Sequence, residues 1–161
     1  MSGRGTPAVR ALEASGCSFT VHEYRHDPAA ASYGEEAAAS LGALGIDPAQ
    51  VFKTLIAAVD GRLTVAVVPV PGQLDLKALA AACGGKRATL AEAAAAERST
   101  GYVLGGISPL GQRTTLPTVV DSSALEHATV LVSAGRRGLD VELAPHDLMA
   151  LTSATTADLA R

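Results

Sequence analysis

Two apolar runs separated by a tight turn dominate the hydrophobic pattern of this chain. Residues 51–59 and 63–70 are each of strand length and rich in β-branched side chains, and Asp60-Gly61 lies between them. Asp-Gly between two apolar runs is a strong hairpin signal. The pattern therefore predicts an antiparallel hairpin at the centre of the fold. Pro69 indicates that the second strand ends at a sheet edge or a bulge.

One lysine interrupts the first of these runs. Because strand side chains alternate between faces, Lys53 is expected to share its face with apolar residues, namely Val51, Leu55, Ala57 and Val59. Such a lysine either extends its head into water at a strand end or lines a pocket. The chain has only three lysines, and this one has the most apolar surroundings, which favours a pocket.

The rest of the pattern alternates short helices with short strands. Helices are expected over 8–15 (opened by Thr6-Pro7 and closed by Gly16), 33–42, 74–83, 90–98 (capped by Thr89) and 145–151. Strands are expected over 18–24, 86–88, 118–120, 129–133 and 138–143, and a glycine-rich loop over 100–111. Because the elements mix without strict strand–helix alternation, the sequence predicts an α/β protein of α+β type. It would be a single domain with a mixed, largely antiparallel sheet surrounded by helices.

Composition and length fit this picture. The chain has 161 residues, of which 48% are apolar and 18% charged, as in a globular domain. Residues 1–5 are expected to form a disordered tail and residues 6–161 the domain. Aromatic residues make up 3%, so the core must consist of Leu, Val, Ile and Ala. Cys17 and Cys83 lack metal-binding spacing and are expected to be small buried residues of a reducing compartment.

The net charge and the lengths of the apolar segments limit which classes of function are expected, namely nucleic-acid binding, secretion and membrane insertion. The net charge of −3 argues against a domain that binds nucleic acid through its overall charge. A nucleic-acid role would need a local basic patch, or a partner protein that binds the nucleic acid. The N-terminus lacks the apolar core of a signal peptide, and no apolar run approaches about 20 residues. A cytoplasmic protein without membrane contact is therefore expected.

Standard catalytic motifs do not occur. The glycines at 101–111 spell neither a dinucleotide fingerprint nor a phosphate-binding loop, and there is no Gly-x-Ser-x-Gly elbow. His22 and His26 are four residues apart, but in a strand that runs into a loop, so no metal site is expected. The pattern predicts no nucleophile with a neighbouring base. What remains is a set of segments that could line one pocket: Tyr24, Lys53, Gly105 to Pro109, Ser133 and Asp140. Taken singly, each also has an ordinary structural interpretation.

Several segments carry a recognisable set of motifs, in the order 6–9, 22–27, 51–55, 72–77, 99–103, 105–112 and 132–140. The most specific is Gly105-Gly106-Ile107-Ser108-Pro109-Leu110-Gly111-Gln112. Together they resemble the YbaK/EbsC family, free-standing aminoacyl-tRNA deacylases related to the editing domain of bacterial prolyl-tRNA synthetase. The resemblance extends from Thr6 to about Leu151. It is stronger to the YbaK branch, which clears Cys-tRNA(Pro), than to the alanine-clearing relatives.

The resemblance implies the editing-domain fold and an aminoacyl-tRNA hydrolase that cleaves the ester of Cys-tRNA(Pro), with no cofactor and no metal. Its partners would be aminoacylated tRNA(Pro) and prolyl-tRNA synthetase. In this branch the thiol of the substrate attacks its own ester carbonyl, which agrees with the missing protein nucleophile. Positioning of a group already in the substrate supplies the rate enhancement. The same reaction on alanine or another amino acid, and a non-catalytic module that binds tRNA or the synthetase, remain alternatives.

The resemblance also assigns roles by position. Lys53, Gly105 and Asp140 would be catalytic: Lys53 would contact the ester or the terminal phosphate and stabilise developing negative charge, and main-chain groups around Gly105 would hold the α-amino group. Tyr24, Ser133 and Asp140 would complete the pocket and orient the terminal ribose. The substrate-binding set is Tyr24, Thr54, Gly106, Ile107, Ser108 and Ser133. The set expected to meet tRNA phosphates is Arg98, Arg136 and Arg137.

Overall fold

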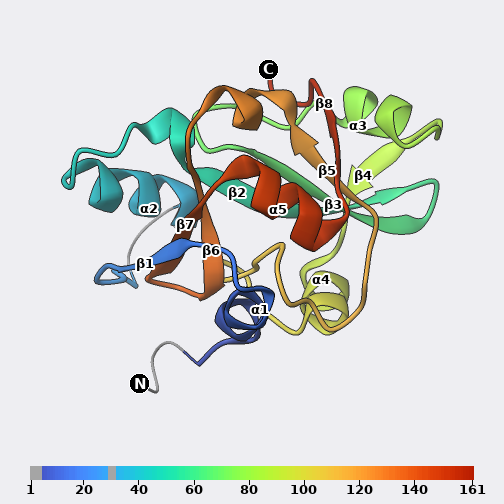
Figure 1. Cartoon of the computed structure of the whole chain (residues 1–161). Coiled ribbons are helices and arrows are strands. Elements are labelled where there is room, and N and C mark those ends of the chain that lie inside the picture. Colours follow the sequence, from blue (N-terminus) through green and yellow to red (C-terminus); the bar gives the residue numbers. More distant parts are fainter. Residues whose placement is uncertain (1–4, 29–31) are drawn as a thin grey trace.

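The computed structural model describes residues 5–28 and 32–161, and most of the expected disordered tail lies outside them. Two sheets are packed against each other with helices at both ends and one side (Figure 1). The strands are β1 (Phe19–Glu23), β2 (Phe52–Val59), β3 (Arg62–Pro69), β4 (Ala88–Leu90), β5 (Thr118–Asp121), β6 (Val130–Arg136), β7 (Leu139–Leu143) and β8 (Thr155–Ala157). The helices are α1 (Pro7–Ser15), α2 (Tyr33–Gly42), α3 (Leu76–Ala82), α4 (Ala93–Thr100) and α5 (Pro145–Thr152), with short 3₁₀ turns η2 (Pro48–Gln50) and η3 (Ser122–Glu126).

The predicted hairpin is confirmed and forms the middle of the larger sheet. β2 and β3 pair antiparallel over their whole length, and Asp60 and Gly61 have φ angles of 50° and 85°. Positive φ at both central residues is the geometry of the turn that Asp-Gly favours. The larger sheet has the order β4-β2-β3-β5-β8, and the pairs β3–β5 and β5–β8 are parallel.

The second sheet is antiparallel, with the order β1-β7-β6. A single parallel bridge between Val51 and Leu131 connects it to the beginning of β2. The sequence predicted one mixed sheet, whereas the strands divide between two. The fold class nevertheless agrees, because the smaller sheet is antiparallel, the larger one is mixed, and both belong to one mixed α/β architecture.

The core lies between the two sheets and is almost entirely aliphatic. Val65 and Val67 of the larger sheet meet Val132 and Val141 of the smaller one in the main buried cluster. The other face of the hairpin is covered by α3 through Leu79. This agrees with the low aromatic content, since few large rings are available to fill the space.

Local signals predicted α1 correctly. The Thr6 hydroxyl accepts a hydrogen bond from the Val9 N–H at 3.2 Å, Pro7 occupies the first helical position, and Gly16 ends the helix with φ 77°.

No helix within the described part of the chain is both long and apolar enough to cross a bilayer.

Two expectations are wrong. Thr89 does not cap a helix over 90–98, because Ala88–Leu90 pairs with the end of β2 and α4 begins only at Ala93. The Asp60 carboxylate accepts hydrogen bonds from the main chain of the approaching segment at 2.9 and 3.0 Å, and this tertiary contact overrides helix propensity. Neither cysteine is buried: Cys83 is exposed, since it follows α3 at the surface, and Cys17 is half-buried.

Candidate active site

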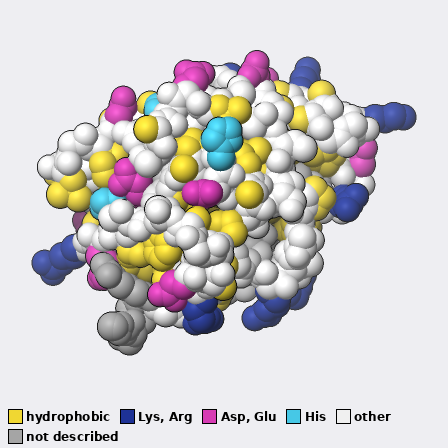
Figure 2. All heavy atoms as spheres, in the orientation of Figure 1, with side chains coloured by type: hydrophobic (Ala, Val, Ile, Leu, Met, Phe, Trp, Pro, Cys, Tyr) yellow, Lys and Arg dark blue, Asp and Glu magenta, His cyan; other side chains and the backbone are white. Residues whose placement is uncertain are grey.

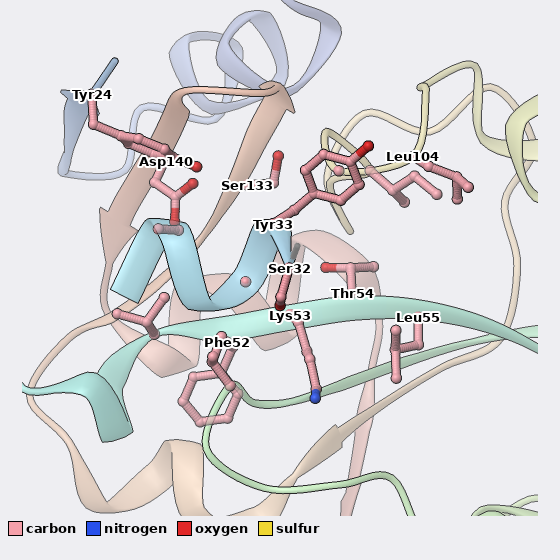
Figure 3. A pocket seen from close by; sticks show the side chains of 16 residues that line it. Tyr24, Ser32, Tyr33, Phe52, Lys53, Thr54, Leu55, Leu104, Ser133 and Asp140 are labelled. Carbon is pink, nitrogen blue, oxygen red and sulfur yellow. The ribbon is translucent and has the colours of Figure 1, made fainter. Parts of the chain in front are cut away.

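A cavity of about 340 Å³ lies beside the first half of β2 (Figure 3). Five consecutive residues, 51–55, line it. Because successive strand side chains point to opposite faces, a cavity that touches all five must lie against the edge of the strand. This edge is open, since β4 pairs only with Ala57–Val59. The cavity therefore occupies the space where β2 leaves the smaller sheet after the Val51–Leu131 bridge.

Segments distant in the sequence form the other walls. α2 contributes its N-terminal part, the loop after α4 contributes Leu104, Gly105 and Ile107, and the smaller sheet contributes the polar residues Ser133 and Asp140. Of the nine positions predicted as catalytic or substrate-binding, seven line this cavity: Tyr24, Lys53, Thr54, Gly105, Ile107, Ser133 and Asp140. Gly106 and Ser108 do not. Ser108 is completely buried, and its hydroxyl accepts a hydrogen bond from the Leu110 N–H at 3.2 Å, so it braces the loop.

Lys53 and Thr54 leave β2 on opposite sides. Figure 3 shows the Thr54 side chain on the side of Ser133 and Tyr33, whereas the Lys53 ammonium points away from them. Lys53 is half-buried, and its stem forms part of the wall. The Thr54 hydroxyl oxygen is buried and has no hydrogen-bond partner among the described residues. A buried hydroxyl without a partner costs free energy, which a ligand able to hydrogen-bond it would recover.

Asp140 is a deeply buried carboxyl group in the wall of the cavity. It lies in β7 between His22 of β1 and Ser133 of β6, directly opposite each, and is only 4% exposed. Burial raises the pKa of its carboxyl group to about 7, and the nearby charge of His22 acts against this increase. Burial also raises the pKa of Tyr24, with a further contribution from the negative charge of Asp140. The cavity thus holds a carboxyl group that titrates near neutrality, a property common at functional sites.

The raised pKa of Asp140 predicts how the stability of the protein depends on pH. The folded protein binds the Asp140 proton more tightly than the unfolded chain does, so the free energy of unfolding should fall as pH rises from about 4 to about 7. Asp140→Asn has no carboxyl group at this position, so this decrease in the free energy of unfolding is removed. The variant should be more stable than the wild type at pH 8 and lose the advantage toward pH 4, as measured by urea midpoints. A larger deficit of the variant at pH 8 than at pH 5 would contradict the assignment.

The glycine pair after α4 makes the close approach on which the cavity depends. The Gly106 N–H donates to the Val103 carbonyl at 2.9 Å, and Gly105 has φ 84°, as in a type II turn. A Cβ atom on Gly105 would lie 2.6 Å from Cγ of Tyr33, and one on Gly106 would lie 2.7 Å from Cα of Arg136. Tyr33 therefore packs directly against the Gly105 main chain, and the loop rests on the β6–β7 connection.

Sequence reasoning missed Tyr33, which it took only as the start of a helix. The Arg137 guanidinium lies 4.6 Å from the centroid of the Tyr33 ring, and its Nε donates to the Leu104 carbonyl at 2.8 Å. Arg137 thus contacts two residues that line the cavity, although it is not itself a lining residue. The Arg136 guanidinium lies 3.9 Å from the Glu23 carboxylate, and Arg98 is exposed on α4; neither of these arginines lines the cavity.

The two histidines considered as a metal pair bind separate carboxylates. His22 Nε2 lies 2.8 Å from Glu142, and His26 Nδ1 lies 2.8 Å from Glu36. Within 5–28 and 32–161, no group of three or more His, Cys, Asp or Glu side chains is arranged to hold a metal ion.

Comparison with known proteins identifies the class to which this fold and cavity belong. The model of the aminoacyl-tRNA editing domain family matches residues 27–151. The chain belongs to this family, which confirms the resemblance inferred from its motifs.

Particular relatives narrow the comparison. The chain is 40% identical over 119 residues to a candidate Cys-tRNA(Pro)/Cys-tRNA(Cys) deacylase, EbsC, of Enterococcus faecalis, covering 72% of this chain and 71% of that protein. It is also similar to the crystal structure of a candidate trans-editing enzyme for prolyl tRNA synthetase, with a TM-score of 0.81, 27% identity, and 96% and 95% of the two chains covered. A hypothetical protein of solved structure matches with a TM-score of 0.83 and 26% identity, covering 96% and 99%. The predicted editing-domain fold is confirmed.

Proposed function

We propose that this protein is a trans-editing deacylase that hydrolyses the ester between cysteine and the 3′ end of tRNA(Pro). The observation that carries the proposal is the cavity at the open edge of β2, where a buried carboxyl group, hydroxyl groups and glycine main chain converge. Two comparisons support this choice of substrate: the chain belongs to the editing-domain family, and it is similar to a deacylase named for Cys-tRNA(Pro).

The groups around the cavity match the parts of an aminoacyl ester. The Asp140 carboxylate and the hydroxyl groups of Tyr24 and Ser133 would accept from and donate to the terminal ribose. Main-chain groups at Gly105 would hold the α-amino group, since glycine lets a ligand approach the backbone closely. The stem of Lys53 starts at the cavity wall, so rotation about its carbon chain would bring the ammonium to the terminal phosphate or to the ester.

Among the described residues that line the cavity, no nucleophile is paired with a histidine base, which favours attack by the substrate. No His or Cys is among these lining residues, and the Ser133 hydroxyl, which lies opposite Asp140 in the β6–β7 pair, accepts a hydrogen bond from the Gly135 N–H at 3.3 Å. In the proposed reaction the cysteine sulfur bonds to its own ester carbon, and the carbon–oxygen bond to the ribose breaks. The ribose oxygen takes up a proton as tRNA leaves. The resulting thiolactone is then hydrolysed by water. A thiol titrates near ~8.5, and a nearby cation favours the reactive thiolate.

Prolyl-tRNA synthetase is the proposed partner. The net charge of −3 makes this chain a weak ligand for tRNA by itself. On the face shown in Figure 2, lysine and arginine side chains lie scattered around the rim and do not gather into one patch. A synthetase that already holds the tRNA would supply the missing affinity, so its addition is expected to increase hydrolysis at physiological salt.

The test is release of the amino acid from Cys-tRNA(Pro), Ala-tRNA(Pro) and correctly charged Pro-tRNA(Pro), with and without the synthetase. We expect cysteine to be released well above the rate without protein, and proline to be spared. Faster release of alanine would reassign the amino acid, because one small group changes binding by only about 1–3 kcal/mol. No hydrolysis of any substrate would leave a non-catalytic binding module.

A further inference from the structure

Next to the cavity, a hydrogen-bonded chain of three side chains ends at His22. The Thr129 hydroxyl donates to one oxygen of Glu142 at 2.5 Å, and the other oxygen lies 2.8 Å from His22 Nε2. The Thr129 hydrogen bond, followed by that of His22, lowers the pKa of Glu142. An ionised carboxylate only accepts hydrogen bonds, so Nε2 carries the proton and donates. This bond holds the imidazole ring in one orientation.

The strand register places this ring beside Asp140. His22 and Asp140 are directly opposite in the antiparallel β1–β7 pair, and Glu142 is two residues further along β7, on the same face. Directly opposite side chains in such a pair lie about 5 Å apart at Cβ. His22 is therefore bonded to one carboxyl group and adjacent to another. Only Asp140 of this group lines the cavity.

Other charged or titratable groups also surround Asp140. Tyr24 lies at the end of β1, and Lys53 lines the same cavity from β2. From α2, Glu36 contributes a negative charge near Tyr24, and that carboxylate is bonded to His26. Of these groups, His22 is the one whose charge lowers the pKa of Asp140, against the larger effect of burial.

We propose that His22 is a positioning residue for the deacylation: held by Glu142, it keeps the Asp140 carboxylate charged and able to accept hydrogen bonds from the substrate. The inference rests on the proposed function, in which Asp140 orients the terminal ribose. The role comes from the tertiary pairing of β1 with β7, so the spacing of His22 and His26 in the sequence gave no indication of it.

The direct test is a pH titration of Asp140 in the wild type and in His22→Gln. The titration is monitored by carbon NMR of protein whose aspartates are isotopically labelled at the carboxyl carbon. Glutamine retains a donor that can reach Glu142 but cannot carry a positive charge. The Asp140 titration is expected to move to higher pH by about 0.5–1 unit. His22→Arg, which restores a cation, should return it toward the wild-type value. His146→Gln removes an exposed imidazole of α5 outside the cavity and should leave it unchanged.

The kinetic test is the ratio of kcat/KM for Cys-tRNA(Pro) between His22→Gln and the wild type across pH. The ratio cancels the titration of the substrate thiol, which both enzymes share. We expect a several-fold loss at about pH 6 that shrinks to within about twofold above pH 8, because Asp140 then ionises in both proteins. An equal loss at every pH, or an Asp140 titration unchanged by the substitution, would overturn the role of His22. If the wild type fails to hydrolyse Cys-tRNA(Pro), the proposed function falls, while the NMR titration still decides whether His22 controls the charge of Asp140.

Discussion

Lys53→Ala is expected to reduce hydrolysis of Cys-tRNA(Pro) by about a hundredfold or more, the scale seen when a group that stabilises developing negative charge is removed. Lys53 is the one lysine of the three in this sequence that lines the cavity. Its removal would leave the negative charge on the ester oxygen, or the terminal phosphate, without a cation. The fold should remain intact, because Lys53 is only half-buried and the variant keeps its Cβ on the wall.

The matched control is Lys77→Ala, which removes an exposed lysine of α3 outside the cavity and should leave turnover unchanged. Lys53→Arg adds a second comparison. It keeps the charge but replaces a compact ammonium with a planar fork, so partial recovery is expected. Full turnover in Lys53→Ala would remove this residue from the mechanism and would fit the direction of its ammonium in Figure 3, away from Ser133 and Asp140.

Replacing cysteine by serine in the substrate is expected to have the second large effect. Serine is nearly isosteric, so binding in the cavity should change little, but its hydroxyl is a far weaker nucleophile than a thiol at neutral pH. Attack by the substrate on its own ester therefore predicts that Ser-tRNA(Pro) is hydrolysed about a hundredfold more slowly than Cys-tRNA(Pro). Both rates are measured after subtraction of the hydrolysis without protein. Equal rates would indicate an activated water molecule instead.

Local sequence signals predicted the parts of the fold that depend on neighbouring residues. Thr6-Pro7 and Gly16 marked α1, and Asp60-Gly61 marked the β2–β3 turn. The division into two sheets and the short edge strand β4 depend on pairing between distant segments, so the local pattern did not reveal them. At Ala88–Leu90 that pairing opposed the local preference for helix, and the tertiary contact prevailed.

In the candidate site, too, some residues could be predicted from sequence motifs, whereas others depend on contacts between distant segments. Motif resemblance pointed to Lys53, Gly105 and Asp140, and the structure gathers them around one cavity from three separate segments. It did not point to Tyr33, whose place depends on a glycine more than seventy residues away. Nor did it point to His22, whose neighbour in space is on β7. Residues that act through tertiary contacts leave no spacing pattern in the sequence.

A second cavity offers an internal comparison. It has a volume of about 320 Å³ and lies at the turn end of the β2–β3 hairpin, with Asp60, Cys83 and Gly85 among its lining residues. The first cavity lies at the opposite end of the same hairpin. A ligand that chooses between them can therefore be located without ambiguity, since the two sets of lining residues have none in common.

The central claim is that the cavity beside Lys53 and Asp140 receives the aminoacylated 3′ end of tRNA. Its most direct test is amide NMR of the protein with an adenosine that carries cysteine through a stable 3′ amide in place of the ester. The account predicts saturable shifts centred on Thr54, Gly105, Ser133 and Asp140, and weaker shifts with adenosine alone. Shifts confined to the second cavity, around Asp60 and Cys83, or no shift at saturating analogue, would contradict it.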